Sequence, residues 1–300
     1  MARTAAYLIH LGEKVSKSQM IHEDITWSKY SSDKVDIGET LARIIRTLDK
    51  ALPLNRPLRA LSIGSSKEPQ FRILQSAFRG GLYLLDIEKT ALEEVKERIH
   101  RQNTNHVYLL HDDFNKIFLN ESKTSKFLKQ EMGGKKAELV TLQHSMYYTP
   151  ALSWYTLIRN LYTKILAPEG ALYCVMMSSE TKDPDSTTWL YNHFAGKFCG
   201  HKNNQDLLQF KRLLKSSPQF KAGGILSKTS RVEFFVEDFE RFMSVVWMIL
   251  LYPQVHKFTA GQREEITRFV YKKFYSKKKP LVQYQDHLVI YRDLGIKGII

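Results

Sequence analysis

The chain contains few cysteines, two among its 300 residues. Cys174 and Cys199 cannot form a disulfide framework, and neither the cysteines nor the ten histidines show the spacing of metal ligands. Long apolar runs are also missing, because the longest, Val245–Tyr252, is far shorter than the roughly 20 residues of a membrane-spanning helix. We therefore expect a cytoplasmic protein without a metal site and without a membrane span.

Several other signals are absent. Met1–Lys14 has no sustained apolar stretch followed by a cleavage site, so no signal peptide is predicted. The chain has no internal repeat and no low-complexity linker, which favours one elaborated domain. It also lacks the glycine–lysine phosphate loop of nucleotide triphosphatases and the glycine–serine elbow of hydrolases, so neither activity is expected.

Acidic residues are outnumbered, 31 against 45 lysines and arginines, and the formal net charge is +14. A charge of this size is compatible with a nucleic-acid partner. The lysines are spread over 123–136, 197–215 and 272–279, however, and no arginine-rich or RNA-binding motif accompanies them. Solvated surfaces are the preferred interpretation, and a nucleic-acid partner stays an alternative.

Short apolar strands alternate with helical segments, and 43% of the residues are hydrophobic, enough for a packed core. This alternation predicts a doubly wound α/β fold, with a mostly parallel seven-stranded sheet and helices on both faces. The predicted strands are 58–63, 82–86, 106–110, 138–143, 171–177, 231–236 and 285–291. We expect residues 1–52 to form an N-terminal helical cap and 53–300 the main domain, in which 237–276 is a helical insertion between strands six and seven.

The first predicted strand is followed by a single glycine, Gly64, and the second ends at Asp86, 22 residues further on. In doubly wound folds such a turn and acid hold an adenosine ribose. Gly64–Pro69 keeps only the first glycine of G-x-G-x-x-G and places Glu68 where a pyrophosphate would lie. The pattern favours an adenosine ligand without phosphates, such as S-adenosylmethionine (SAM); a plain strand–turn–helix unit is the alternative.

Five motifs, in order, resemble those of the class I SAM-dependent methyltransferases. They are the glycine motif Ala60–Gly64, the ribose-binding acid in Leu84–Ile87, the polar turn His111–Phe114 beside the adenine, the fourth strand Ala137–His144 and the helix–turn–strand signature Leu166–Tyr173. The resemblance covers residues 40–180 well and 205–292 only by pattern. Gln143–Tyr148 is faintly similar to histamine-type small-molecule N-methyltransferases.

One departure from the family concerns the glycine motif. The family usually has an acid two residues before the first glycine and further glycines after it, where this chain has Ser62, Ser65 and Ser66. The cofactor-binding residues that the resemblance implies are Gly64, Ser65, Asp86, Ile87, Asp113, Phe114 and Gln143. Asp113 is preferred over its neighbour Asp112 for the adenine.

Candidate catalytic residues follow the fourth strand. His144 is the candidate general base or substrate-orienting group, and the alternative is a histidine that only hydrogen-bonds a neighbouring loop. Tyr147 is predicted to line the methyl path, because aromatic faces attract a sulfonium.

Substrate-side candidates come from three segments: Tyr30, Tyr148, Trp189, Tyr191 and His193. Tyr30 ends an aromatic and polar stretch suited to a mobile lid, or else to an arm packed on the core. Residues 181–204 are expected to be a long substrate loop, since loops of this length are usually functional. The alternative is a surface excursion that uses the same rings for packing.

The sequence thus predicts an enzyme that transfers a methyl group from SAM to a nitrogen or oxygen of a small molecule. An RNA methyltransferase is one alternative, motivated by the charge. A SAM-binding protein without transfer activity is the other, because the glycine motif is degenerate.

Overall fold

The computed structural model describes residues 5–17, 20–53, 55–221, 223–251 and 257–292. Within them, seven strands form a sheet of order β3-β2-β1-β4-β5-β7-β6. The strands are β1 (Arg59–Ile63), β2 (Gly81–Asp86), β3 (Val107–His111), β4 (Ala137–Gln143), β5 (Leu166–Met177), β6 (Gly223–Phe234) and β7 (Leu281–Arg292). All seven strands predicted from the sequence are present. β1 lies in the sheet between β2 and β4, and the turns that follow these strands contain the candidate site residues.

The sheet is mixed, and the expectation of a mostly parallel sheet is wrong. β1 pairs in parallel with β2 and β4, β2 with β3, and β4 with β5. β7 runs antiparallel to both β5 and β6. A helix between two strands usually indicates that the strands are parallel. β7, however, follows β6 in the chain and lies next to it in the sheet, and two such strands can pair antiparallel without a crossover connection. Strand and helix patterns do not encode this change of direction.

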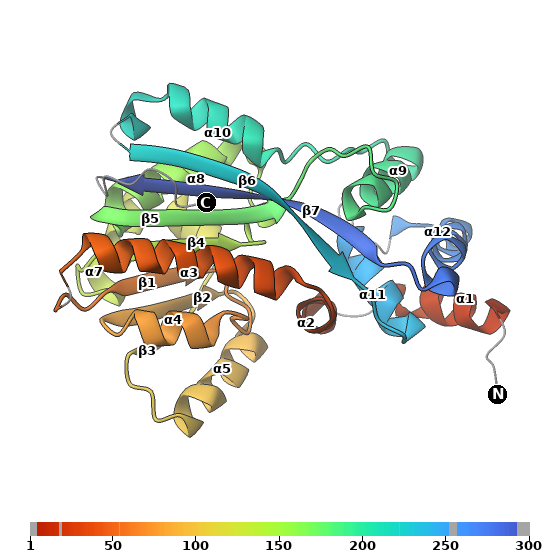
Figure 1. Cartoon of the computed structure of the whole chain (residues 1–300), viewed down its shortest axis with the longest axis horizontal. Helices are drawn as coiled ribbons and strands as arrows, with labels where there is room; N and C mark the ends of the chain where they lie inside the picture. The colour runs from red at the N-terminus through yellow and green to blue at the C-terminus, as the bar shows by residue number, and fades with distance from the viewer. Residues whose placement is uncertain (1–4, 18–19, 54, 222, 252–256, 293–300) are drawn as a thin grey trace. The chain divides into compact units, whose positions relative to one another are not determined.

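Twelve α-helices are described, and α11 and α12 lie between β6 and β7 in the chain (Figure 1). They are α1 (Ala5–Lys14), α2 (Met20–Tyr30), α3 (Asp33–Ala51), α4 (Phe71–Ala77), α5 (Lys89–Arg101), α6 (Phe114–Phe118), α7 (Glu121–Glu131), α8 (Trp154–Asn160), α9 (Thr187–Cys199), α10 (Leu207–Ser216), α11 (Phe239–Ile249) and α12 (Ala260–Lys273). None of these helices is long and apolar enough to cross a membrane.

The chain forms two compact units. The sheet unit comprises the described parts of Ile37–Met176, Gln205–Thr229 and the residues from Asp286 onward. The second unit comprises those of Met1–Asp36, Met177–Asn204 and Ser230–Gln285. α3 from Ile37 onward therefore belongs with the strands, although the sequence groups it with the predicted cap.

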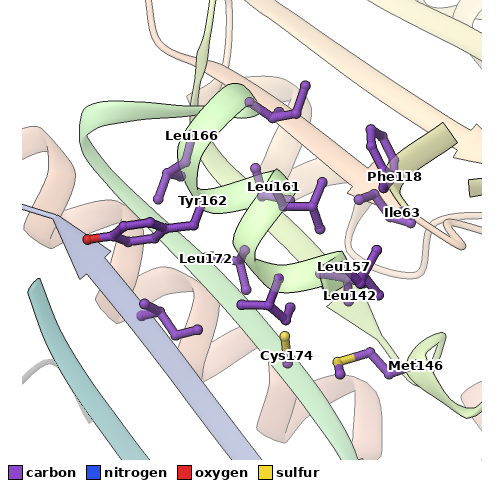
Figure 2. Packing of buried hydrophobic residues seen from close by; sticks show 14 of the residues in the cluster. Ile63, Phe118, Leu142, Met146, Leu157, Leu161, Tyr162, Leu166, Leu172 and Cys174 are labelled. Carbon is purple, nitrogen blue, oxygen red and sulfur yellow. The ribbon is translucent and has the colours of Figure 1, made fainter. Parts of the chain in front are cut away.

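Helices cover both faces of the sheet unit, because side chains alternate along each strand. Ala60 and Leu82 face a cluster that includes Leu41 of α3, with α4 and α5 on the same side. Leu61 and Ile63 face the opposite cluster, built with α6, α7, α8 and α10. Figure 2 shows this second cluster, which includes Leu142, Cys174 and Met146 near the carboxyl end of β4. The packed core therefore extends to the carboxyl end of β4.

Candidate functional site

The turn after β1 lies directly against the turn after β4. Gly64 has φ +65°, and a Cβ added to it would lie 2.4 Å from Cβ of Ser145. Both the backbone conformation and the space therefore require glycine here. The N–H groups of Gly64 and Ser65 both donate to the carbonyl of Leu85, at 2.9 and 3.2 Å. The glycine turn is thus fixed to β2 on one side and pressed against β4 on the other.

Asp86 ends β2 with its side chain buried. One carboxylate oxygen accepts the N–H of Ser66 at 2.6 Å, and the other accepts that of Glu88 at 2.7 Å. These bonds hold the carboxylate between the two turns. Each oxygen has a further lone pair, so the group can still accept hydrogen bonds from the two hydroxyls of a ribose.

Four buried polar atoms beside these turns have no hydrogen-bond partner among the described residues. They are the hydroxyl oxygens of Ser65, Thr141 and Ser145 and the amide nitrogen of Gln143. Buried polar groups are nearly always paired, with protein, water or ligand. At the carboxyl ends of β1 and β4 these atoms are available to water or to a polar ligand, and both hydroxyls and amides suit an amino-acid tail.

Glu68 is a residue of this turn that sequence reasoning misplaced. The glycine pattern places it where the pyrophosphate of a dinucleotide would lie, but its carboxyl is buried, accepting the Ser62 hydroxyl at 2.5 Å and the N–H of Gln70 at 3.2 Å. Burial raises the pKa of Glu68 to about 7, against the opposing effects of these two hydrogen bonds and of Arg98. One sequence signal for this buried position was available: Ser62, close to Glu68 in the chain, stands where the resembled family has an acid.

The residues predicted to contact the adenine surround the ends of β2 and β3. Ile87 is 61% exposed, and its carbonyl lies 2.9 Å from Nε2 of His111. Asp113 caps α6 by accepting the N–H of Asn115 at 2.9 Å, while Phe114 is buried. An exposed isoleucine directly after Asp86 offers the apolar surface that a flat base needs.

His144 adopts the left-handed conformation, with φ +52°. Its N–H donates to the carbonyl of Val175 at 3.0 Å, which extends the β4–β5 pairing by one residue. Its Nδ1 lies 3.3 Å from the hydroxyl of Tyr147, and the two rings are nearly parallel with centroids 6.0 Å apart. Such a conformation is unfavourable for a residue with a Cβ and concentrates at functional sites.

Asn115, which the sequence did not single out, ties the turn after β3 to the chain beyond β4. Its amide nitrogen donates to the carbonyl of Tyr148 at 3.0 Å, and its oxygen accepts the hydroxyl of Thr149 at 2.6 Å. The Tyr148 side chain is 55% exposed. The predicted cofactor-binding and catalytic residues, with Tyr148, are therefore all brought to one edge of the sheet unit.

The other substrate-side candidates lie in the second unit, and the expectation of a loop over 181–204 is wrong. The middle of this segment forms α9. Ser186 caps the first turn of α9 by accepting the N–H of Trp189 at 3.1 Å, and Gly200, with φ +68°, follows its last residue. Apolar rings spaced for one helix face were mistaken for loop residues. Tyr30 accepts a hydrogen bond from Arg241 at 2.9 Å.

The aromatic residues of α9 divide into a buried and an exposed set. Tyr191 is 4% exposed within the hydrophobic cluster of the second unit, which also contains Trp27. Trp189 is partly buried and His193 is exposed; their rings stack with centroids 4.5 Å apart, and each also stacks with Phe269 of α12. Tyr191 therefore packs in the core, His193 is accessible, and Trp189 is accessible only in part.

Replacing Tyr191 with alanine should lower the free energy of unfolding by about 3 kcal/mol or more, because it removes a large buried side chain. His193→Ala, on the exposed side of the same helix, should change it by less than about 1 kcal/mol. Urea titrations of both variants measure this difference. An equal loss of unfolding free energy in the two variants would mean that His193 contributes to the core as much as Tyr191 does.

Among the described residues, no group of three or more histidine, cysteine or acidic side chains could hold a metal ion. No protein-family model matches the chain, and a search of curated proteins found no match.

Solved structures do resemble it. The YcgJ protein of Bacillus subtilis has a TM-score of 0.53 and 11% identity, over 87% of this chain and 99% of that one. A candidate methyltransferase of Bacillus halodurans C-125 has a TM-score of 0.51 and 12% identity, over 83% and 98%. The chain therefore has the fold of the class I SAM-dependent methyltransferases, which confirms the predicted resemblance.

Proposed function

We propose that this protein is a SAM-dependent methyltransferase that acts on a nitrogen or oxygen of a small molecule. The observation that carries the proposal is the pair of apposed turns, in which Gly64 lies against Ser145 and Asp86 is held beside them. The fold, and the name of the Bacillus halodurans protein, support the same assignment.

The residues present fit SAM in three parts. Asp86 would accept the ribose hydroxyls, and Ile87, Asp113 and Phe114 would flank the adenine. The methionine tail would satisfy the polar atoms of Ser65, Gln143 and Ser145 that have no partner among the described residues. Fixed protein groups of this kind orient a ligand without needing to move.

SAM supplies a methyl group that is already activated by the positive sulfur to which it is bonded. The protein must therefore mainly hold the acceptor atom in line at about 3 Å and exclude water, because proximity and orientation give most of the acceleration. His144 would orient the acceptor and, where the acceptor arrives protonated, take its proton. Tyr147, 3.3 Å from Nδ1 of His144, would fix the imidazole.

For the acceptor side we propose Tyr148, which lies in the sheet unit with His144 and is 55% exposed. Tyr30, Trp189, Tyr191 and His193 belong to the second unit, and their role in substrate binding stays a prediction from the sequence.

RNA is the second candidate acceptor, favoured by the net charge of +14. Several lysines are neutralised locally, among them Lys67 by Glu94, Lys164 by Glu121 and Lys197 by Glu265. An excess absorbance at 260 nm in the purified protein, removed by nuclease, would favour RNA over a small molecule.

Calorimetric titration tests the proposed function. We expect SAM and its product S-adenosylhomocysteine to bind, and NAD not to bind, because the turn after β1 keeps only the first of the three glycines that admit a pyrophosphate. NAD binding, or the absence of SAM binding by the folded protein, would contradict the proposal. Binding of SAM without turnover on a broad panel of acceptors would favour the alternative function, that of a SAM-binding protein without transfer activity.

A further inference from the structure

The segment around His144 carries no charged side chain. From Leu139 to Ile158 the sequence has no lysine, arginine, aspartate or glutamate, although 25% of all residues in the chain are charged. Burial explains this for β4 and for most of α8, whose side chains belong to the core. It does not explain the turns between them, 144–153, which are exposed in part. The surface that follows His144 is therefore uncharged for a reason other than burial.

Side-chain hydrogen bonds fix the backbone of these turns. The amide of Gln205 donates to the carbonyl of Tyr147 at 3.1 Å, and the amide of Asn115 donates to the carbonyl of Tyr148 at 3.0 Å. The oxygen of Asn115 accepts the hydroxyl of the buried Thr149 at 2.6 Å. The first two bonds are made to the main chain, so they hold the segment in place without using the side chains of Tyr147 and Tyr148.

The side chains that this backbone presents to solvent are apolar or aromatic. Within 148–152 the exposed residues are Tyr148, Pro150 and Leu152, which we call the apolar ledge. Tyr148 is 55% exposed and Leu152 is 99% exposed. One exposed leucine is ordinary, but several exposed apolar groups on a fixed backbone are typical of a binding surface. Four residues of chain span at most about 14 Å, so the α-carbon of Tyr148 lies within that distance of those of His144 and Leu152.

The turn after β3, to which Asn115 joins this segment, adds no excess of positive charge. Asp113 pairs with Lys116 at 3.9 Å, and Asp112 is a further acid. An anionic acceptor such as the phosphate backbone of RNA is bound by lysines and arginines. Neither 112–116 nor 139–158 supplies them in excess. The charges and the exposed side chains both favour a neutral ligand.

We propose that the apolar ledge binds the body of the methyl acceptor, and that this acceptor is a neutral molecule with an aryl or alkyl group. The proposal rests on the proposed function, because it assigns an acceptor class to the site of His144. Tyr148 would contact the part of the acceptor nearer the reacting atom, and Leu152 the part further from it. Removing that apolar body from water would supply the affinity.

Calorimetry on the full chain, saturated with S-adenosylhomocysteine, tests the ligand class without requiring turnover. The probes are para-ethylphenol, para-butylphenol and para-hexylphenol, with para-hydroxybenzoate and tyramine as an anionic and a cationic phenol. We expect the affinity to rise about two- to fourfold for each added methylene group. Both charged phenols should bind more weakly than para-ethylphenol, and a short uridylate oligonucleotide should not compete with para-hexylphenol.

Two matched variants assign the effect to the ledge. Leu152→Lys should reduce the gain in affinity from para-ethylphenol to para-hexylphenol by about fivefold or more, because the alkyl chain loses an apolar contact. Leu213 of α10 is also exposed, at 52%, so Leu213→Lys adds the same charge outside the ledge and should leave the alkyl series unchanged. Both positions are exposed, so both variants should fold and bind S-adenosylhomocysteine as the wild type does.

The failures are distinguishable. Affinity that does not rise with alkyl length, tighter binding of a charged phenol, or competition by the oligonucleotide overturns this inference. So does a Leu152→Lys protein that keeps the wild-type alkyl series. A wild-type dimer in sedimentation velocity that Leu152→Lys dissociates also overturns it, since a second copy would then cover the ledge. All these results leave the proposed function intact, whereas absence of S-adenosylhomocysteine binding overturns the proposed function itself.

Discussion

Asp86→Ala is expected to weaken SAM binding by about 1.5–3 kcal/mol, roughly 10- to 150-fold, the usual range for hydrogen bonds to a charged group. The loss has two sources. The ribose hydroxyls lose their acceptor, and the N–H groups of Ser66 and Glu88 lose theirs, so the glycine turn is less well held. Calorimetry with SAM and S-adenosylhomocysteine measures the effect.

Asp86→Asn is the matched control. It keeps the size of the side chain and one acceptor oxygen but turns an NH₂ group toward one of the two backbone N–H donors. Its affinity should lie between those of the wild type and the alanine variant. Unchanged affinity in a folded Asp86→Ala protein would remove the central argument for the ribose contact.

His144→Ala should lower turnover by about 10²-fold or more, within the range typical of general acid–base catalysis. SAM affinity should hardly change, because the imidazole is assigned to the acceptor side. The measurement is single-turnover transfer of radiolabelled methyl from SAM to the best acceptor of a panel of amines and phenols. Tyr147→Phe, which keeps the ring and removes the hydroxyl 3.3 Å from Nδ1, should have a smaller effect.

Two other results would change the assignment of His144. Loss of SAM binding in a folded His144→Ala protein would place the residue in the cofactor site. Unchanged turnover would mean that it only shapes the turn, and His144→Gly would then raise stability, since glycine adopts φ +52° without strain.

The sequence signals for the candidate site are strongest where they are local. Gly64 and Asp86 belong to one strand–turn–helix–strand stretch, so their relation depends on spacing alone. The contact of Gly64 with Ser145 joins residues far apart in the chain, and no pattern in either segment indicates it. Glu68 was misplaced because its positive φ occurs at a residue type that gives no warning of it.

Other parts of the fold were harder to predict for different reasons. The capping serine Ser186 and the terminal Gly200 of α9 were readable signals, but the polar residues before them suggested a loop. The direction of β7 was not readable, since a strand has the same alternation whichever way it runs. Whether a strand is parallel or antiparallel depends on the strands beside it in the sheet, and not on its own residues.

The division into two units has a consequence for synthesis on the ribosome. The chain passes between the units at 36/37, 176/177, 204/205, 229/230 and 285/286, so neither unit is a continuous segment. Trp27 packs on Phe234 in the finished second unit, with ring centroids 5.5 Å apart, and 207 residues of chain separate them. At about 5–20 residues per second, the tryptophan emerges roughly 10–40 s before its partner exists. The nascent protein is therefore expected to carry Trp27 without the partner that covers it through most of its translation, which makes this tryptophan a candidate site for chaperone contact.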